Sequence, residues 1–464
     1  MDHLSVQTGC SRHRTDMSAL TALNDSKQIA RDIFEYALKQ TSVSFAFAKH
    51  VAYERGILRV YEDLYELNAF ARVLVIAFGK AAHTMTEALA GQLGSRAQGI
   101  IAAPAAALEG VSQVPRFRYF AAGHPTPNEE SVKAARAALQ SIASLTDRAL
   151  VIYLISGGGS SLLEQPIDDE ISLADLKATY AALVNCGAPI AEINAVRKHL
   201  SAEKGGRLTR AVDVAAPGSQ QVSIMISDVP DHALDSLASG PTMPDSTTVE
   251  QCYVLAARYS LRKSFPQSVT ELFDHRSLEE TPKKDDPCFR NSRWWTVLSN
   301  QEALKAAAMK ASEHGYAVDI DNSCDDQDYA KAADYLLDKV RKLRRGASRV
   351  CLISGGEVTV TVGNDAGTGG RNQQFALYCA GKIASERITV LSGGTDGIDG
   401  NSQAAGAVVD GHTLEQFSLQ GGGQSLTSVL KRCDSGPVLE KLGASIVTGP
   451  TGNNLRDLRI LLAD

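Results

Sequence analysis

Residues 352–378, with the sequence LISGGEVTVTVGNDAGTGGRNQQFALY, contain the combination of elements that decides the fold of this chain. The stretch begins as an apolar strand, turns at Ser354-Gly355-Gly356 and continues as an alternating strand from Glu357 to Val362. A glycine-rich loop follows and leads into a helical pattern that begins at Arg371-Asn372-Gln373. Short apolar strands alternate with helices elsewhere too, so the sequence predicts an α/β fold with mainly parallel sheets.

The loop at 363–370 has two interpretations. Glycines let backbone N–H groups approach a ligand closely, and a helix N-terminus favours anions. The planar guanidinium of Arg371 suits a carboxylate or a phosphate. An anion site and a tight glycine hairpin with a solvated arginine explain these residues equally well.

Length and composition narrow the class of protein. A chain of 464 residues is too long for one ordinary core, so two domains are expected. Hydrophobic residues make up 44% of the chain, the net charge is −6, and the scattered Lys and Arg form no nucleic-acid footprint. No run of ~18 apolar residues predicts a membrane span. The eight cysteines form no CxxC pair, which favours reduced thiols in a cytoplasmic protein.

The predicted domain boundaries follow changes in composition. Residues 1–20 are polar, lack the apolar core of a signal peptide and are expected to form a disordered leader. A first domain is predicted over residues 21–260 and a second over 293–464, whose last segment is free to return to the first. Between them, residues 261–292 are charged, contain three prolines and lack periodicity, so we interpret them as an interdomain excursion.

Lys80 follows an apolar run at 73–78 that is typical of a strand buried on both faces. The strand ends at Gly79-Lys80 and a helix follows over 81–93, which places the lysine at the carboxyl edge of a sheet, where open α/β folds bind ligands. The pattern GxxxxGK[ST] of a P-loop is absent. From position alone, a solvated surface lysine is an equally good interpretation.

A second glycine-rich loop follows the apolar run 150–155. It contains Ser156, Gly157, Gly158, Gly159 and Ser160, and three glycines between hydroxyls suit a phosphate cradle of backbone N–H groups. One such loop is weak evidence, but the SGG segments that start at residues 354 and 392 also follow apolar strands. We therefore expect three strand–SGG turns to line one sheet edge.

Two acidic residues and one basic cluster each have a structural and a functional interpretation. Asp228 follows an apolar strand and Asp396 lies in a glycine-rich turn, so each can be a Mg²⁺ ligand or the cap of a turn. Arg197 belongs to a basic cluster that either faces solvent or holds an acidic substrate. The cluster consists of Asn194, Arg197, Lys198, Lys204 and Arg207.

His124 lies in the turn 122–131, before a helix for which Asn128 is the predicted N-cap. Two prolines follow closely and make the turn rigid. The histidine can touch a substrate from this position, but a structural role in the turn is the more common outcome. We therefore leave it out of the predicted site.

Nine segments together resemble the glycerate 2-kinases of the MOFRL type, a family once called hydroxypyruvate reductases. They are GKAA (79–82), GHPTPNEES (123–131), ISGGGSSLL (155–163), INAVRKHLSAEKGGRL (193–208), SDVPDHALDSLASGPTMPDSTT (227–248), GGRNQ (369–373), TDGIDG (395–400), AAGAVVDG (404–411) and TGPTGNNLRDLR (448–459). They occur in family order and are far more specific together than any single glycine loop. One departure is Asn401-Ser402, where family members often have Pro-Thr or a similar pair.

The resemblance implies a fold and an activity. The fold is α/β with two domains, a Rossmann-like doubly wound N-terminal domain and a smaller mixed α/β C-terminal (MOFRL) domain, with the active-site cleft between them. The activity is phosphorylation of D-glycerate to 2-phosphoglycerate with ATP and Mg²⁺. Lys80 and Arg371 are then active-site residues that face each other across the cleft.

Residue roles combine this resemblance with the chemistry of phosphoryl transfer, which needs positioning and charge neutralisation more than covalent chemistry. Lys80, Arg371 and Asp228 are the predicted catalytic residues, and Asp228 and Asp396 are the predicted metal ligands. The predicted nucleotide- or substrate-binding residues are Ser156, Gly157, Gly158, Gly159, Ser160, Arg197, Ser354, Gly355, Gly356, Glu357, Asn372 and Asn453.

Two other functions remain open at this stage. The first is an NAD(P)-dependent hydroxypyruvate reductase, against which no GxGxxG follows a strand with an acidic residue ~20 positions on. The second is a non-catalytic sensor of sugar acids, against which the chain retains Lys80, Arg371 and several acidic loop residues. The expected partner is a small molecule, without nucleic acid or membrane, and the chain can form a homodimer.

Overall fold

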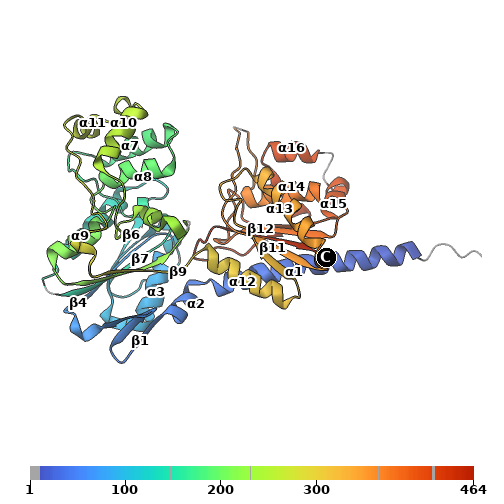
Figure 1. Ribbon diagram of the computed structural model, residues 1–464, viewed down its shortest axis with the longest axis horizontal. Coiled ribbons are helices and arrows are strands. Elements are labelled where there is room, and N and C mark those ends of the chain that lie inside the picture. Colours follow the sequence, from blue (N-terminus) through green and yellow to red (C-terminus); the bar gives the residue numbers. More distant parts are fainter. Residues whose placement is uncertain (1–10, 147, 230, 364, 421–423) are drawn as a thin grey trace, which may run out of the picture. The chain divides into compact units, whose positions relative to one another are not determined.

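The structure is a computed structural model that describes residues 11–146, 148–229, 231–363, 365–420 and 424–464, with side chains from residue 25 onward except at 231 and 232 (Figure 1). The chain divides into two compact units. Unit 1 comprises Met1–Ser42, Asn300–Thr451 and Leu455–Asp464, and unit 2 comprises Val43–Ser299 and Gly452–Asn454. Each unit has its own sheet and cores.

Unit 2 is built on a six-stranded sheet in the order β6-β5-β4-β7-β8-β9, and every adjacent pair is parallel. The strands are β4 (Arg72–Phe78), β5 (Gln98–Pro104), β6 (Phe117–Ala122), β7 (Ala149–Ile155), β8 (Gln220–Ile226) and β9 (Ser292–Leu298). This is the doubly wound order of a Rossmann-like fold and confirms that prediction. The order reverses between β4 and β7, so the loops after these two strands meet at the point where such folds bind ligands.

The strands and helices of unit 2 form where the apolar pattern predicts them. All seven residues of β7 are buried, because helices cover both faces of a parallel sheet. The helices α3 (Ala82–Leu93), α5 (Glu129–Ala143) and α9 (Arg207–Ala215) pack against this sheet or each other. Asn128 caps α5 by accepting a hydrogen bond from the Ser131 N–H, as predicted.

Two parts of unit 2 were not predicted. A small antiparallel sheet is formed by β1 (Val51–Glu54), β2 (Ile57–Val60) and β3 (Asp63–Glu66). A layer with its own apolar core is formed by α7 (Leu173–Asn185), α8 (Ile190–His199), α10 (Val249–Arg258) and α11 (Gln267–Asp274). Because α11 buries Val269 and Phe273 in that core, residues 261–292 lie inside unit 2 and are not an interdomain excursion. The remaining helices are α2 (Val43–His50), α4 (Ala105–Leu108) and α6 (Gly159–Leu162).

Unit 1 is built on a mixed sheet in the order β10-β11-β15-β12-β13-β14. The strands are β10 (Ala317–Ile320), β11 (Val350–Ser354), β12 (Ile388–Gly394), β13 (Gly406–Asp410), β14 (Ser445–Ile446) and β15 (Asp457–Ala463). Only β10 and β11 are parallel, so the expectation of mainly parallel sheets is wrong for this unit. The cause is β15, which lies in the middle of the sheet and pairs antiparallel with both β11 and β12.

Helices cover both faces of the unit 1 sheet. One core contains side chains of α13 (Tyr329–Arg344) and α14 (Arg371–Lys382), and the other contains α1 (Ser11–Gln40) and α12 (Asn300–Glu313). Helix α1 therefore belongs to the C-terminal sheet, which moves the predicted start of the first domain, and it begins inside the predicted disordered leader. Residues 1–10 of that leader lie outside the described residues. The other helices are α15 (Thr413–Gln420), α16 (Leu426–Lys431) and α17 (Ser435–Lys441).

The predicted strand from Glu357 to Val362 is also wrong. This segment forms no strand, and its only ladder contact among the described residues is an isolated bridge between Asp328 and Thr359. Val358 is buried, whereas Val362 is largely exposed, so the alternating letters do not line one buried face. The helix that follows, α14, starts at Arg371 as predicted.

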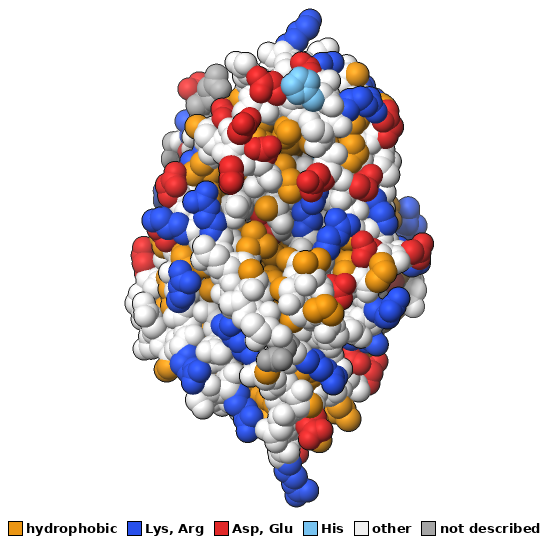
Figure 2. Space-filling model, turned by 90° about the vertical axis from the view of Figure 1, so that its left-hand side faces the viewer, with side chains coloured by type: hydrophobic (Ala, Val, Ile, Leu, Met, Phe, Trp, Pro, Cys, Tyr) orange, Lys and Arg blue, Asp and Glu red, His pale blue; other side chains and the backbone are white. Residues whose placement is uncertain are grey.

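Two surface properties bear on partners. In the described part of the chain, no helix combines the length and the apolar character that crossing a membrane requires. On the face of the molecule in Figure 2, blue Lys and Arg side chains are interspersed with red Asp and Glu side chains.

Candidate active site

The loop after β7 and the junction after β4 interlock at the carboxyl edge of the unit 2 sheet. The Lys80 N–H donates to the Gly157 carbonyl at 2.9 Å, and the Ala81 N–H donates to the Ser156 hydroxyl oxygen at 3.0 Å. A Cβ on Gly79 would lie 2.1 Å from Ser156 Oγ, so only glycine permits this approach. Lys80 and the SGGGS loop are thus brought together as predicted.

The SGGGS loop offers backbone donors. Gly158 has a φ of 82°, in the left-handed region that favours glycine, and the short helix α6 begins directly after it. Within the described ranges, the N–H groups of Gly157, Gly158, Gly159 and Ser160 donate no hydrogen bond to another residue. Consecutive free N–H groups in such a turn form a concave site for an anion.

Three ionisable side chains surround this loop. A Cβ on Gly157 would lie 2.0 Å from Asp228 Oδ2. A Cβ on Gly158 would lie 3.1 Å from His124 Cε1 and 3.4 Å from Lys80 Cγ. Asp228 thus lies against Gly157, while His124 and Lys80 lie against Gly158. The predicted residues Lys80 and Asp228 therefore lie around one loop, together with a histidine that the prediction omits.

The basic cluster around Arg197 is mostly internal rather than open to ligand. Lys198 is buried and pairs with Asp245 at 3.1 Å, while Lys204 is buried and pairs with Glu203 at 2.9 Å and with Glu164. Burial raises the pKa of Glu203, although the positive charge of Lys204 acts in the opposite direction. Buried charges need partners of opposite charge. Lys198 and Lys204 are therefore part of internal ion pairs, which accounts for the cluster of basic residues in the sequence.

Arg197 itself lies over the ring of Tyr180, with 4.6 Å between the guanidinium carbon and the ring centroid. The Tyr180 hydroxyl in turn donates to Glu164 at 2.6 Å. This stacking fixes the arginine within the helical layer of unit 2. Its role in substrate binding stays a prediction.

In unit 1, Arg371 lies at the start of α14, where two carboxylates hold it. Its Nε and Nη2 donate to the two oxygens of Asp457 at 2.6 and 3.0 Å, and Nη2 also pairs with Glu357 at 2.9 Å. These carboxylates raise the pKa of Arg371 against the opposing effect of burial. Among the described residues Nη1 has no partner, and the side chain is 35% exposed, so one edge of the guanidinium is available to a ligand.

The helix N-terminus beside Arg371 is already occupied by the protein. The carboxylate of Asp399 accepts from the Asn372 N–H at 3.0 Å and from the Gln373 N–H at 2.8 Å. Burial raises the pKa of Asp399 to about 6, and these two hydrogen bonds oppose the rise. The anion predicted at this helix start is therefore the chain's own Asp399.

The predicted cradle at Ser354, Gly355 and Gly356 is filled in the same way. The Gly355 N–H donates to Asn322 Oδ1 at 2.9 Å, the Gly356 N–H to Asn300 Oδ1 at 3.1 Å, and the Glu357 N–H to Asp325 Oδ1 at 2.9 Å. These N–H groups cannot bind a phosphate while the side chains stay in place. The turn is therefore not an open amide cradle, and a role of Ser354, Gly355, Gly356 and Glu357 in ligand binding stays a prediction.

The expectation of three SGG turns on one sheet edge is also wrong. The segment at 156 belongs to unit 2, and the segment at 392 lies within β12 rather than in a turn. The Ser392 hydroxyl donates to Asn372 Oδ1 at 2.6 Å, so the predicted ligand-binding amide of Asn372 is held between Ser392 and Asp399. Asn372 is a buried connector between β12 and α14.

The predicted metal ligands lie in different units. Asp228 is in unit 2, and Asp396 is in unit 1, where it accepts from the Ile398 N–H at 3.2 Å. Among the described residues, no group of three or more His, Cys, Asp or Glu side chains is placed to hold a metal ion. Asn453 belongs to the short segment of the C-terminal region that clusters with unit 2, and the neighbouring Gly452 approaches Thr84 of α3.

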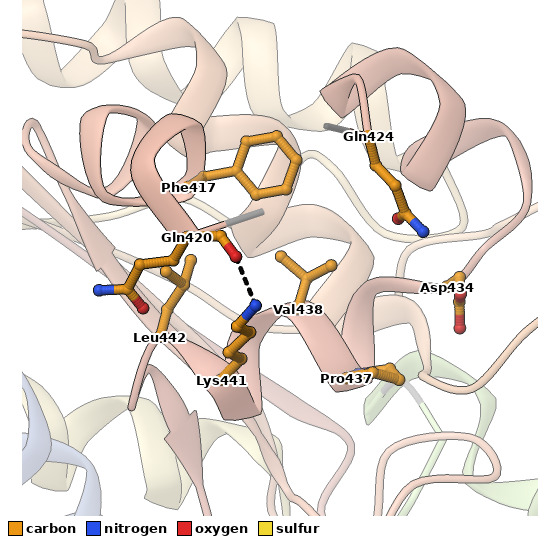
Figure 3. A pocket seen from close by; sticks show the side chains of 8 residues that line it. All are labelled: Phe417, Gln420, Gln424, Asp434, Pro437, Val438, Lys441 and Leu442. Atoms are coloured by element: carbon orange, nitrogen blue, oxygen red, sulfur yellow. Dashed lines mark hydrogen bonds between the residues drawn. The ribbon is translucent and has the colours of Figure 1, made fainter. Parts of the chain in front are cut away.

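Sequence reasoning missed the groups that complete both sites. Asp457 is fully buried opposite Arg371, and Ser239 places its hydroxyl 2.9 Å from that of Ser160. Both residues lie in segments that resemble the family, 227–248 and 448–459, but their partners Ser160 and Arg371 are far away in the sequence and only the tertiary structure reveals these contacts. A pocket of about 200 Å³ between α15 and α17 (Figure 3) contains none of the predicted site residues.

Family models and known proteins match most of the chain. Residues 29–274 match the model "Domain of unknown function (DUF4147)", and residues 350–457 match the MOFRL family. The chain is 36% identical over 410 residues to a D-glycerate 2-kinase of Thermotoga maritima, covering 86% of this chain and 93% of the relative. It is 34% identical over 448 residues to a glycerate 2-kinase of Pyrococcus horikoshii, covering 94% and 98%.

The solved structures agree with the sequence relatives. A crystal structure of a glycerate kinase from Thermotoga maritima superposes with a TM-score of 0.81 at 32% identity, covering 95% of this chain and all of that chain. Two relatives from Agrobacterium vitis carry the words hydroxypyruvate reductase in their names. The similarity to the solved glycerate kinase therefore extends over nearly the whole chain.

Proposed function

Because the chain belongs to the glycerate 2-kinase family, we propose that it transfers a phosphoryl group from ATP to the 2-hydroxyl of D-glycerate and releases 2-phosphoglycerate. The observation that carries this proposal is the SGGGS loop at the β4–β7 reversal, where four backbone N–H groups lie beside Lys80. Phosphoryl transfer needs such donors and cations around the charged oxygens more than it needs covalent chemistry.

Each unit contributes one cation to the proposed chemistry. In unit 2, the loop N–H groups and the ammonium of Lys80 bind phosphoryl oxygens and neutralise the charge that moves during transfer. In unit 1, the free edge of Arg371 binds the glycerate carboxylate, while Asp457 and Glu357 orient the guanidinium.

Mg²⁺ fits this site through a single protein carboxylate. The ion is commonly held by one or two carboxylates together with substrate phosphates, so it does not require a cluster of three such side chains, which the described residues lack. Asp228, which lies against Gly157, is the residue we propose to hold it, and the ion would supply charge neutralisation for the phosphates. Asp396 stays a weaker second candidate because it lies in unit 1.

The reductase alternative is not favoured. A dinucleotide-binding β–α turn carries GxGxxG, whereas the first turn of this sheet has Gly79 followed by Lys80. The glycerate 2-kinase relatives cover nearly the whole chain. NADH oxidation with hydroxypyruvate, followed at 340 nm, is expected to show no turnover above the rate without protein.

Two wider expectations belong to the same proposal. We propose that the partner is a small hydroxy acid rather than nucleic acid or membrane, and that any assembly is a homodimer. We also propose a reducing, cytoplasmic location, which the free thiols of Cys186, Cys252, Cys288, Cys324, Cys351, Cys379 and Cys433 support.

The direct test is product identification. Purified protein with ATP, Mg²⁺ and D-glycerate is coupled to enolase, which acts on 2-phosphoglycerate without a mutase. An immediate signal supports transfer to the 2-hydroxyl. A signal that requires mutase would keep the kinase but overturn the position of transfer, and no ADP at all would overturn the proposed substrate.

A further inference from the structure

The His124 ring lies at the open loop rather than only in its own turn. Its Nδ1 is 3.2 Å from Ser161 Oγ, within hydrogen-bonding distance. The ring and the aliphatic stem of Lys80 contact the same face of Gly158, where a Cβ would meet both. The side chain is exposed, so a ligand in the loop can reach it.

The contact with Ser161 selects one tautomer of the imidazole. The Ser161 hydroxyl donates to the Gly158 carbonyl at 3.3 Å, and it has only one proton to donate. Its oxygen therefore accepts from His124, which places the imidazole proton on Nδ1. The other nitrogen, Nε2, then carries a lone pair and can accept a proton.

The charges around the ring keep it neutral near pH 7. Partial burial lowers the pKa of His124, and the positive charge of Lys80 lowers it further. Asp228 lies on the neighbouring Gly157 and Ser161 is uncharged, so Lys80 is the charged side chain that shares the contact with Gly158. A neutral histidine beside a phosphate-binding lysine has the protonation state that a general base requires.

We propose that Nε2 of His124 is the general base that takes the proton from the 2-hydroxyl of the acceptor. This inference rests on the proposed kinase function. As the hydroxyl oxygen forms its bond to the γ-phosphorus, its proton moves to Nε2 and the bond between that phosphorus and the ADP oxygen breaks. The imidazolium later releases the proton to solvent, so atoms and charge balance over the cycle.

Three variants separate a chemical role from a structural one. The amide nitrogen of Asn can occupy the place of Nδ1 and donate to Ser161, so His124→Asn keeps the turn contact and removes the base. In His124→Gln the amide group reaches the place of Nε2 instead, so the contact with Ser161 is lost and no base is restored. His124→Ala leaves room for added imidazole. His275→Asn, at an exposed histidine after α11, is the matched control.

We expect kcat of His124→Asn to fall about 100-fold, at the lower end of general-base effects, with unchanged thermal stability. The acidic limb of the pH–kcat/KM profile, which lies below the ordinary histidine pKa of 6.5, should flatten, and imidazole should partly restore His124→Ala. Substrate ionisations are common to all variants and cancel in this comparison.

Other results would overturn the inference. Wild-type kcat and an unchanged acidic limb in His124→Asn would show that the turn contact alone matters. If His124→Ala fails to fold, the Asn and Gln variants still decide the question. Failure of the wild-type protein to form ADP from ATP and glycerate would instead overturn the proposed function, so the two failures are distinguishable.

Discussion

The two SGG segments that follow strands β7 and β11 share a sequence pattern but differ in the state of their backbone donors. In unit 2, the N–H groups at 157–160 have no partner among the described residues. In unit 1, the N–H groups at 355–357 are all taken by side-chain oxygens of Asn322, Asn300 and Asp325. The comparison teaches that a glycine-rich turn is an anion site only when no distant side chain supplies the acceptors first.

The turn at 355–357, which we call the plugged loop because side-chain oxygens occupy its N–H groups, has a structural role in unit 1. Asn300 accepts from Gly356 and also donates to the carbonyls of Leu455 and Asp457 at 2.7 and 3.1 Å. It thereby ties the turn after β11 to the start of β15, the central strand of the sheet. The open loop in unit 2 is held instead through its carbonyl and hydroxyl oxygens, which leaves the N–H groups at 157–160 unused. The Gly157 carbonyl and the Ser156 hydroxyl accept from Lys80 and Ala81, and the Ser160 hydroxyl contacts that of Ser239.

Removal of the cation beside the open loop is expected to have the largest effect. In Lys80→Ala, the loop donors remain but the phosphoryl charge loses its nearest lysine, so kcat should fall about 100- to 1000-fold. The measurement is steady-state kinetics with the enolase-coupled assay, and thermal unfolding controls for folding. Near-wild-type kcat would remove Lys80 from the active site.

A pair of glycine substitutions compares the two loops directly. Gly157→Ala drives a methyl group into Asp228, so we expect kcat to fall about 10- to 100-fold with a modest loss of stability. Gly355→Ala places a Cβ 1.9 Å from Asn300 Oδ1 and displaces the plug, so its main effect should be a loss of about 2 kcal/mol of unfolding free energy.

Urea unfolding and steady-state kinetics on both variants check this pair. If Gly157→Ala and Gly355→Ala lost similar amounts of kcat and had nearly the same stability, the distinction between an open and a plugged loop would be contradicted.

Arg371→Lys tests whether two-point orientation by Asp457 matters. Lysine keeps the charge but cannot donate two parallel hydrogen bonds to one carboxylate. We expect kcat/KM for glycerate to fall about 10-fold and the variant to be less stable, because buried Asp457 keeps a poorer partner. Unchanged kinetics with a lowered melting temperature would assign Arg371 a structural role only.

Asp399→Asn is expected to have the smallest effect on turnover, and it tests the helix N-terminus that Asp399 occupies. The folded-state pKa of about 6 exceeds the ordinary 3.8, so the folded protein binds this proton more tightly than the unfolded chain does. Its contribution to stability is therefore present at low pH and is lost as pH rises through 6. When the pH is raised from about 4.5 to 7, the free energy of unfolding of the wild type should fall by about 2 kcal/mol more than that of the variant.

Urea unfolding at both pH values checks this difference. If the free energy of unfolding changed equally with pH in the wild type and in Asp399→Asn, the carboxyl would have its ordinary pKa in the folded protein.

The sequence predicted those features that depend on local patterns. The apolar runs that form β4, β7, β8 and β11 are local, and so are the Asn128 cap of α5, Lys80 and the SGGGS loop. The antiparallel position of β15 was not predictable from its amino-acid sequence, because the direction of a strand depends on the strands with which it pairs in the folded chain. The side chains that occupy the turn at 355–357 could not be predicted either, since Asn300 and Asn322 accept hydrogen bonds from a turn more than thirty residues away in the sequence.

His124 shows the same limit from the other side. Its turn was predicted, but its contact with Gly158 and Ser161 depends on the parallel alignment that brings the ends of β6 and β7 into the same region. Sequence position alone favoured a structural histidine. Only the geometry of the loop indicates a role in chemistry.

The most direct test of the comparison is amide hydrogen–deuterium exchange, with and without ATP, Mg²⁺ and glycerate. The account predicts that amides at 157–160 exchange rapidly in the free protein and become protected with substrates. Amides at 355–357 should be protected from the outset and change little. Protection of the second loop by substrates, with the first unaffected, would contradict the assignment of the anion site to unit 2.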